Sequence, residues 1–290
     1  MKSDDFKNPP IAELLILLGS NPRKRIVILE GHSDEALWEQ HLDLKVVGAS
    51  YYVAYGKSNV VEYVAQVRSK YLNRVLGVVD RDYGEARRLY DSEFNGIISS
   101  SQNDIELDIL TFGNFQRCLQ ASLSSVKLDR SKICSNDLTN IAVCAAAEVG
   151  ALRKLSKCEE LNIDFQCYDF KGRDFSPSKL PNKSWFDPSK LIMKFLDDVA
   201  NFGKVDNKLE LVAKCEVHCA GVEDKISICR GHDVSSVLAI LHNYFRKANR
   251  SSRNAEDVND LVLGHISKAE FSQIPVYQDL DNWLAPRVDV

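Results

Sequence analysis

Apolar runs alternate with amphipathic segments through the first third of the chain. Short runs rich in Val, Ile and Leu, such as 25–29 and 74–79, have the length and composition of buried strands. Between them, apolar positions recur at helical spacing, as in 58–71. Strands that alternate with helices in this way favour a parallel sheet with right-handed crossovers. The predicted elements are a helix ending at Gly19, strands or extended segments at 25–29, 46–55, 74–79 and 96–100, and helices at 33–42 and 58–71.

The pattern becomes helical beyond about residue 104, with one more strand-like stretch at 165–170. We therefore expect an α/β fold class, in which a small domain with a Rossmann-like parallel sheet is followed by a mostly helical region. The later helices are predicted at 136–161, 188–201, 207–219, 234–248 and 255–266. The expected divisions are an N-terminal helical lead at 1–23, the α/β domain at 24–112 and the helical region at 113–290.

Composition narrows the class of protein. The 290 residues are 44% hydrophobic and 27% charged, which is typical of a globular protein with one or two cores. The longest apolar run, 11–18, is shorter than the ~20 residues of a membrane span, and it has no cleavable signal pattern before it. We expect a cytoplasmic protein that does not associate with a membrane. The eight cysteines lie in helical and strand-like contexts, which favours reduced core thiols over a disulfide scaffold.

Carboxylates follow two of the predicted strands. Glu30 comes directly after the first strand, and Asp80 and Asp82 come after the third. Side chains two apart on an extended chain point to the same side, and open α/β sheets bind ligands at the carboxyl ends of their strands. These acids are therefore expected to share one pocket. Clustered carboxylates require a cation or a bound proton, and hard oxygen ligands favour Mg²⁺ or Mn²⁺ over zinc.

A glutamate at a strand end, followed later by an Asp-x-Asp motif, resembles the TOPRIM family of primases, topoisomerases and OLD nucleases. The resemblance covers about residues 24–112. The segments EGHSDEALW, AYGKSNV, GVVDRDYG and NDIELDIL resemble more narrowly the OLD-like TOPRIM effectors of PARIS anti-phage defence, the AriB group. This resemblance implies that Glu30 helps to hold metal and to move protons, and that Asp80 and Asp82 are paired metal ligands.

Further acidic positions correspond to the OLD-type site. Asp34 lies one helical turn after Glu30 and on the same face, where it fits an additional acidic position. Glu106, or Asp104, fits the late acidic position. A helix N-terminus enriched in acids explains Asp104, Glu106 and Asp108 nearly as well. The resemblance thus implies a Mg²⁺ or Mn²⁺ site formed by Glu30, Asp34, Asp80, Asp82 and Glu106.

The segment Gly56-Lys57-Ser58 has the ending of a phosphate-binding P-loop. A Walker A motif needs a glycine five residues before Gly56, and that position is Tyr51. The segment therefore does not predict ATP hydrolysis by a P-loop. Lys57 is interpreted as a catalytic cation at the rim of the crevice that could contact a scissile phosphate, with an ordinary loop lysine as the alternative.

Two histidines could also take part. His32 lies close to the strand-terminal glutamate. His232 belongs to a Gly-His-Asp sequence that could supply a base or a ligand, although a helix start capped by Asp233 explains that sequence as well.

The net charge of −4 confines any nucleic-acid contact to a local patch. The segment 170–194 carries six Lys and Arg against two Asp, interleaved with aromatic residues. Basic side chains can bind phosphates and aromatic rings can stack on bases, so this segment suits a single-stranded nucleic acid. A solvated loop with its aromatic side chains folded inward is the alternative. The candidate nucleic-acid-binding residues are Lys171, Arg173, Lys179, Lys183 and Trp185.

The predicted activity is phosphodiester hydrolysis with two metals about 4 Å apart, held by Glu30, Asp80 and Asp82. Resemblance to the PARIS effectors implies a toxic RNase that cuts host transfer RNA after release from an ABC-type, AriA-like ATPase, with a homodimer as the active form. DNA remains open as the substrate, as for OLD-like DNA nucleases. A non-catalytic docking subunit is the alternative from another class, and the intact set of three acids speaks against it.

Overall fold

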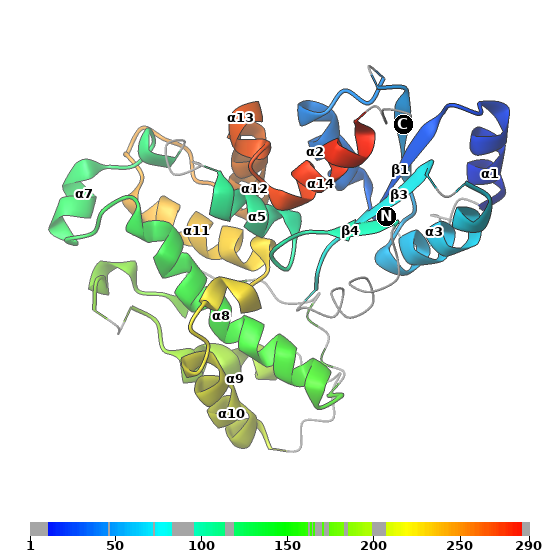
Figure 1. The fold of residues 1–290 in the computed structure, drawn as a ribbon. Helices are drawn as coiled ribbons and strands as arrows, with labels where there is room; N and C mark the ends of the chain where they lie inside the picture. The colour runs from blue at the N-terminus through cyan, green and yellow to red at the C-terminus, as the bar shows by residue number, and fades with distance from the viewer. Residues whose placement is uncertain are drawn as a thin grey trace. The chain divides into compact units, whose positions relative to one another are not determined.

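The chain divides into two compact units in the computed structural model (Figure 1). Unit 1 comprises Met1–Asp108 and Ser267–Val290, and unit 2 comprises Ile109–Ile266. Unit 1 contains a parallel sheet with flanking helices and unit 2 is mostly helical, so the predicted fold class is confirmed. The structure describes residues 11–45, 47–71, 73–82, 96–113, 119–161, 163, 165, 170, 174–182, 185–198 and 207–285.

Four strands form the sheet of unit 1: β1 (Arg25–Leu29), β2 (Ala49–Val53), β3 (Val75–Val79) and β4 (Ile97–Ser99). They lie in the order β2-β1-β3-β4, and each neighbouring pair is parallel. β3 is buried at every position, which is usual for a central strand of a parallel sheet that is covered on both faces. The carboxyl ends of β1 and β3 are therefore neighbours (Figure 1).

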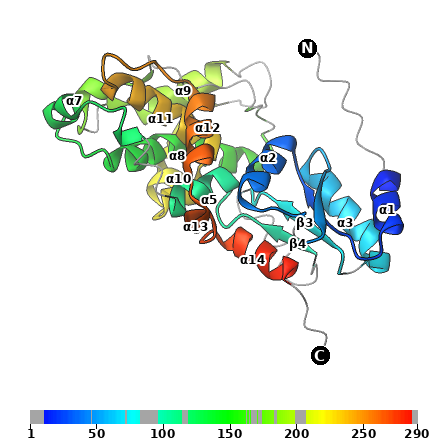
Figure 2. The same cartoon turned by 90° about the horizontal axis from the view of Figure 1, so that it is seen from above.

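Two helices from the first part of the chain cover one face of the sheet. α1 (Ile11–Ser20) and α3 (Lys57–Tyr71) pack there, as Figures 1 and 2 show. Ile26 and Ile28 of β1 join the core cluster that these helices form with the sheet. Because side chains alternate along a strand, the residues between them point to the opposite face.

The opposite face is covered by α2 (His32–His41) and by α14 (Pro275–Leu284), which comes from the far end of the chain. α13 (Lys268–Phe271) packs against α2. Trp38 of α2 is only 1% exposed. Its ring meets Phe271 edge-on at 5.4 Å and stacks on Tyr277 at 6.3 Å between centroids. The sequence pattern places residues 267–285 in the helical region after residue 112, whereas the structure groups them with the sheet and α2 in unit 1.

Unit 2 is built around a long central helix. α8 (Asp137–Cys158) packs against α9, α10 and α11. Arg153 of α8 donates to both carboxylate oxygens of Asp233, at 3.2 and 2.9 Å, and the pairing compensates the burial of both charges. The further helices are α7 (Ser125–Arg130), α9 (Pro188–Asp198), α10 (Lys208–Ala220), α11 (Gly231–Phe245) and α12 (Ala255–His265).

The structure corrects one sequence interpretation in unit 2, and a second prediction falls largely outside the described residues. A helix start capped by Asp233 was one interpretation of the Gly-His-Asp sequence, but α11 begins at Gly231 and the Asp233 side chain pairs with Arg153. In the strand predicted at 165–170, Phe165 and Phe170 lie outside any strand, and residues 166–169 fall outside the described residues.

The six described cysteines form no disulfide, as predicted, but only half of them are core residues. Cys215, Cys219 and Cys229 are buried, and Cys134, Cys144 and Cys158 are exposed. Cys118 and Cys167 lie outside the described residues.

Within the described ranges, no helix combines the length and the apolar character needed to cross a membrane.

Candidate metal centre

Two acidic residues meet where β1 and β3 end. Glu30 follows β1 and Asp80 follows β3, and because these strands are parallel neighbours, both residues leave the sheet at the same end. The backbone N–H of Asp80 donates to Oε1 of Glu30 at 2.7 Å. The structure therefore brings together two of the acids singled out in the sequence.

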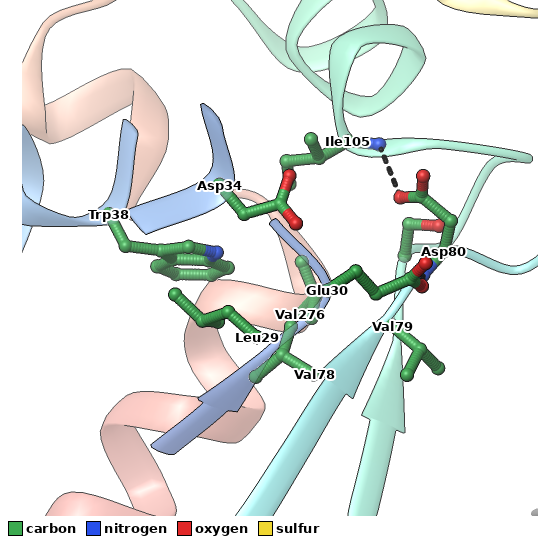
Figure 3. Close-up of a pocket in the computed structure, with 10 residues that line it drawn as sticks. Leu29, Glu30, Asp34, Trp38, Val78, Val79, Asp80, Ile105 and Val276 are labelled. Atoms are coloured by element: carbon green, nitrogen blue, oxygen red, sulfur yellow. Dashed lines mark hydrogen bonds between the residues drawn. The ribbon is translucent and has the colours of Figure 1, made fainter. Parts of the chain in front are cut away.

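A small cavity opens at this end of the sheet, and three carboxylates line it (Figure 3). Glu30, Asp34 and Asp80 reach it from the end of β1, the first turn of α2 and the end of β3. The cavity measures about 20 Å³, which is room for about one water molecule or ion. Apolar side chains enclose it, among them Leu29, Trp38, Val78, Ile105 and Val276.

Burial raises the pKa of each carboxyl group in this cavity. The pKa of Glu30 rises to about 7, because desolvation outweighs the hydrogen bond from Asp80 and the charge of Lys57. Burial likewise raises the pKa of Asp80 well above its ordinary value, and the neighbouring negative charges add to the effect. Three anions in one small, partly apolar space repel each other, so the site favours a proton or a cation.

Asp34 also serves its own helix. Its Oδ2 accepts the backbone N–H of Gly31 at 2.9 Å, which satisfies a free donor at the start of α2. Burial raises the pKa of Asp34 to about 6, and the negative charge of Glu106 adds to this shift. Asp34 therefore combines a structural contact with a place in the cavity.

The start of α5 (Ile105–Phe112) adjoins the same carboxylates. The backbone N–H of Ile105 donates to Oδ1 of Asp80 at 3.3 Å, as the dashed line in Figure 3 marks. A helix N-terminus favours negative charge, so α5 partly offsets the crowding of acids. Glu106 is half-buried and does not line the cavity, but its charge raises the pKa of both Asp34 and Asp80.

The other acids of this segment have structural contacts. Oδ1 of Asp104 accepts the backbone N–H of Leu107 at 2.9 Å, as the residue before a helix often does. Asp108 accepts hydrogen bonds from the backbone and hydroxyl of Ser101 and from the backbone of Gln102. Between Asp104 and Glu106, the two candidates for the late acidic position, Glu106 is thus the one without a capping contact of this kind.

Asp82 does not share the cavity with Asp80. We expected strand alternation to align the two side chains, but β3 ends at Val79 and Asp82 lies in a turn with φ 47°. Its Oδ2 accepts a hydrogen bond from Nζ of Lys57 at 3.0 Å. Lys57 also donates to the backbone carbonyl of Asp80 at 2.5 Å, so this lysine lies beside the acidic site at the start of α3.

An exposed hydrogen-bonded group lies next to this end of the sheet. His32 is 61% exposed, and its Nδ1 is 3.0 Å from Oε2 of Glu35. Its Nε2 is 2.9 Å from the hydroxyl of Tyr55, whose φ of 56° is in the left-handed region. His32 is therefore held near the site, whereas His232 is an exposed residue of unit 2.

The donor set fits a hard divalent cation in chemistry and size. Glu30, Asp34 and Asp80 offer carboxylate oxygens around an ion-sized space, and burial is the main cause of their raised pKa values. In the part of the chain that the structure describes, no three Asp, Glu, His or Cys side chains are spaced as a ready-made ligand set. Glu30, Asp34 and Asp80 instead use carboxylate oxygens to accept backbone N–H groups.

The basic and aromatic segment at 170–194 folds inward where it is described. Phe170, Phe175 and Trp185 are buried, and Trp185 stacks on Phe175 at 5.3 Å between centroids. These rings are thus not presented as an open stacking surface. Lys179 is exposed, and Lys171, Arg173 and Lys183 fall outside the described residues.

The sequence did not single out several residues that complete the cavity. Ser100 lines it, and its hydroxyl oxygen accepts the backbone N–H of Arg81 at 3.0 Å. Val276 reaches it from α14, far away in the chain. A serine after a short strand gives a weak signal, and no local pattern links Val276 to residues near 30.

Comparisons with known proteins add no assignment. No known family model matches the chain, and neither does any curated protein. The functional argument therefore depends on the chemistry of the site.

Proposed function

We propose that unit 1 is a metal-dependent phosphodiesterase of the TOPRIM type. One observation carries the proposal: three carboxylates from three separate segments line one ion-sized cavity at the carboxyl end of a parallel sheet. Bringing three such groups together in a partly apolar space is unfavourable unless a proton or a cation compensates their charge. A site that serves folding alone has little need for this arrangement.

The residues divide the expected chemistry between them. Glu30, Asp34 and Asp80 would hold Mg²⁺ or Mn²⁺, which when bound polarises a phosphoryl oxygen and lowers the pKa of water. Glu30 lies beside the cation that it would help to hold, where its carboxylate would accept a proton from the attacking water. Lys57 places a positive charge beside Asp80, where it can attract a phosphate oxygen. The water oxygen bonds to phosphorus as the bond to the leaving oxygen breaks.

A more specific proposal concerns the biological role. The resemblance to PARIS effectors supports a cytoplasmic, toxic endoribonuclease of anti-phage defence that cuts host transfer RNA. It also supports an ABC-type, AriA-like ATPase as inhibitor and sensor, with a homodimer as the released form. An OLD-like DNA nuclease is the alternative within the same chemistry.

Activity and substrate can be tested with purified protein. Transfer RNA, single-stranded DNA and plasmid are each incubated with Mg²⁺ or with chelator, using wild type, Glu30→Ala and Asp80→Ala. We expect cleavage that requires the cation and is abolished in both variants, with transfer RNA as the preferred substrate. Glu39→Gln removes an exposed acid of α2 and should retain activity. Wild-type activity in either site variant at saturating Mg²⁺ would exclude this assignment of the site.

A non-catalytic docking subunit is the second candidate. It is favoured by the absence of a ready-made ligand set among the described residues, and by the backbone donors that the carboxylates bind. Thermal unfolding with added Mn²⁺ separates the two candidates. A catalytic site should be stabilised by Mn²⁺ in wild type and not in Asp80→Asn, whereas a docking subunit should respond in neither.

The partner is tested by co-purification with an ATPase encoded next to this chain. We expect a stable complex from which ATP and a phage trigger release an active, dimeric chain. Release should increase cleavage of transfer RNA in parallel with the dimer fraction. A free chain that is monomeric and fully active would contradict this scheme.

A further inference from the structure

A second and larger cavity lies in unit 2, between α8 and the segment that leads into α9. It measures about 540 Å³, which is within the range of small-molecule sites. α8 and α9 pack against each other, and Figure 1 shows them side by side. The walls of the cavity are mainly apolar: Ile141, Leu180, Pro181, Trp185, Phe186 and Pro188.

One buried carboxylate faces this apolar space without a complete set of partners. Glu148 lines the cavity and is only 7% exposed, and its Oε2 has no hydrogen-bond partner. The thiol of Cys219 forms a hydrogen bond with this carboxylate, and the charge of Lys225 also acts on it. An unsatisfied buried acceptor costs free energy, and a ligand that donates an N–H would compensate it.

A lysine is held at the same cavity by a close helix contact. Lys225 lines the cavity from η5 (Lys225–Ile228), which packs on α8. Gly150 of α8 permits this approach, because a Cβ there would lie 1.8 Å from the carbonyl oxygen of Ile228. The cavity thus has a deep acceptor at Glu148 and a half-buried cation at Lys225.

We propose that this cavity binds a nucleobase that carries an exocyclic amino group, with its phosphate directed toward Lys225. The flat ring suits the space beside Trp185 and Phe186, where aromatic side chains support base stacking. The amino group donates to the carboxylate of Glu148, and the phosphate pairs with Lys225. The inference does not depend on the nuclease proposal, because none of its residues belongs to the acidic site of unit 1.

The charges of the cavity limit the ligand. Asp137 and Glu148 provide two negative charges against the single Lys225. Such a rim can pair with one phosphate but opposes a triphosphate. A nucleoside monophosphate and a single nucleotide of an RNA strand both meet these requirements. In this proposal, the basic and aromatic segment 170–194 contacts a base through Trp185 in the wall of the cavity, and not through an open stacking surface.

The chain contains its own probe of occupancy. Cys144 is exposed and lines the cavity, whereas Cys158 is an exposed thiol of the same helix that does not line it. A bound base should shield Cys144 from an alkylating reagent and leave Cys158 unaffected. Mass spectrometry of the two peptides measures both rates in one sample, which corrects for reagent and for protein loss.

The test uses the full chain in chelator, so that an oligonucleotide stays intact. AMP, CMP, GMP, UMP, the matching nucleosides and a short single-stranded RNA are added separately. We expect an amino-bearing nucleotide to slow alkylation of Cys144 at least about fivefold at about 1 mM, and UMP to bind about tenfold more weakly. If a monophosphate protects Cys144, the ligand is a free nucleotide. If only the RNA protects Cys144, the ligand is a nucleotide within an RNA strand.

Variants separate recognition from folding. Glu148→Met removes the acceptor at similar volume and should abolish protection, whereas the exposed Glu223→Gln should retain it. Lys225→Met should remove the advantage of monophosphates over nucleosides. Circular dichroism verifies the fold of each variant. The proposal is overturned if no nucleotide or RNA protects Cys144, if UMP protects as well as the others, or if folded Glu148→Met retains full protection.

Discussion

Glu30 is only partly exposed and can carry a charge, and desolvation disfavours its charged form. Its pKa rises from 4.5 to about 7, chiefly through desolvation. The folded state therefore holds a proton that the unfolded chain has already lost between these pH values. Stability falls as pH rises through this window, because the unfolded state then binds fewer protons. The acidic site thus destabilises the metal-free protein at and above neutral pH.

Replacing Glu30 by glutamine should increase stability when no metal is present. The amide removes the charge but retains the shape and can still accept the N–H of Asp80. In chelator, we expect the melting temperature of Glu30→Gln to exceed that of wild type by roughly a few degrees at pH 8, and by little at pH 5. Thermal unfolding across this pH range measures the difference. Glu39→Gln, an exposed change on α2, should show no such dependence.

Lys57 should set the pH at which the site accepts a cation. Its charge lowers the pKa of Glu30, so Lys57→Met should raise that pKa further. A cation binds the deprotonated carboxylate, and the midpoint of Mn²⁺ binding should therefore move to higher pH. Titrations of the melting temperature with Mn²⁺ at several pH values give this midpoint. Lys57→Arg should restore it, and the exposed Lys45→Met should leave it unchanged. An unchanged midpoint in Lys57→Met would contradict this role.

At the scale of elements, unit 2 depends on a close approach between α8 and η5. A side chain at Gly150 would collide with the backbone of Ile228, so the two elements must separate in Gly150→Ala. We expect a loss of about 1–3 kcal/mol or more in the free energy of unfolding of unit 2. Gly264→Ala in α12 meets no atom within 4 Å and should stabilise by up to about 1 kcal/mol. Denaturant unfolding of both variants provides the comparison.

Local patterns predicted the elements but not every direction within them. The apolar run 25–29 coincides with β1, and 74–79 contains β3, because a buried parallel strand needs continuous apolar residues. Glu30 and Asp80 were predicted to meet because strand ends fix their positions. The prediction that Asp82 shares the pocket of Asp80 assumed an extended chain, but β3 ends at Val79 and Asp82 lies in a turn.

At the scale of the whole molecule, unit 1 is formed by two separated stretches of chain. The second stretch begins at Ser267, beyond the whole of unit 2 in the sequence. Sequence periodicity reports which residues of a helix are apolar, but not which distant surface they cover. The contacts of Trp38 with Phe271 and Tyr277, and the place of Val276 in the cavity, therefore could not be predicted.

The last prediction tests this division by hydrogen exchange. Phe271 is fully buried beside Trp38, and Phe271→Ala should cost about 3–5 kcal/mol in the stability of unit 1. Amides of α14 and of β1 should then lose protection together, because they belong to one cooperative unit. Gly150→Ala should instead reduce protection in α8 and η5. We expect each variant to reduce amide protection only in the unit that contains the substitution. If α14 lost protection with α8 in Gly150→Ala while β1 remained protected, the C-terminal segment would belong to the helical region, as its place in the sequence first suggested.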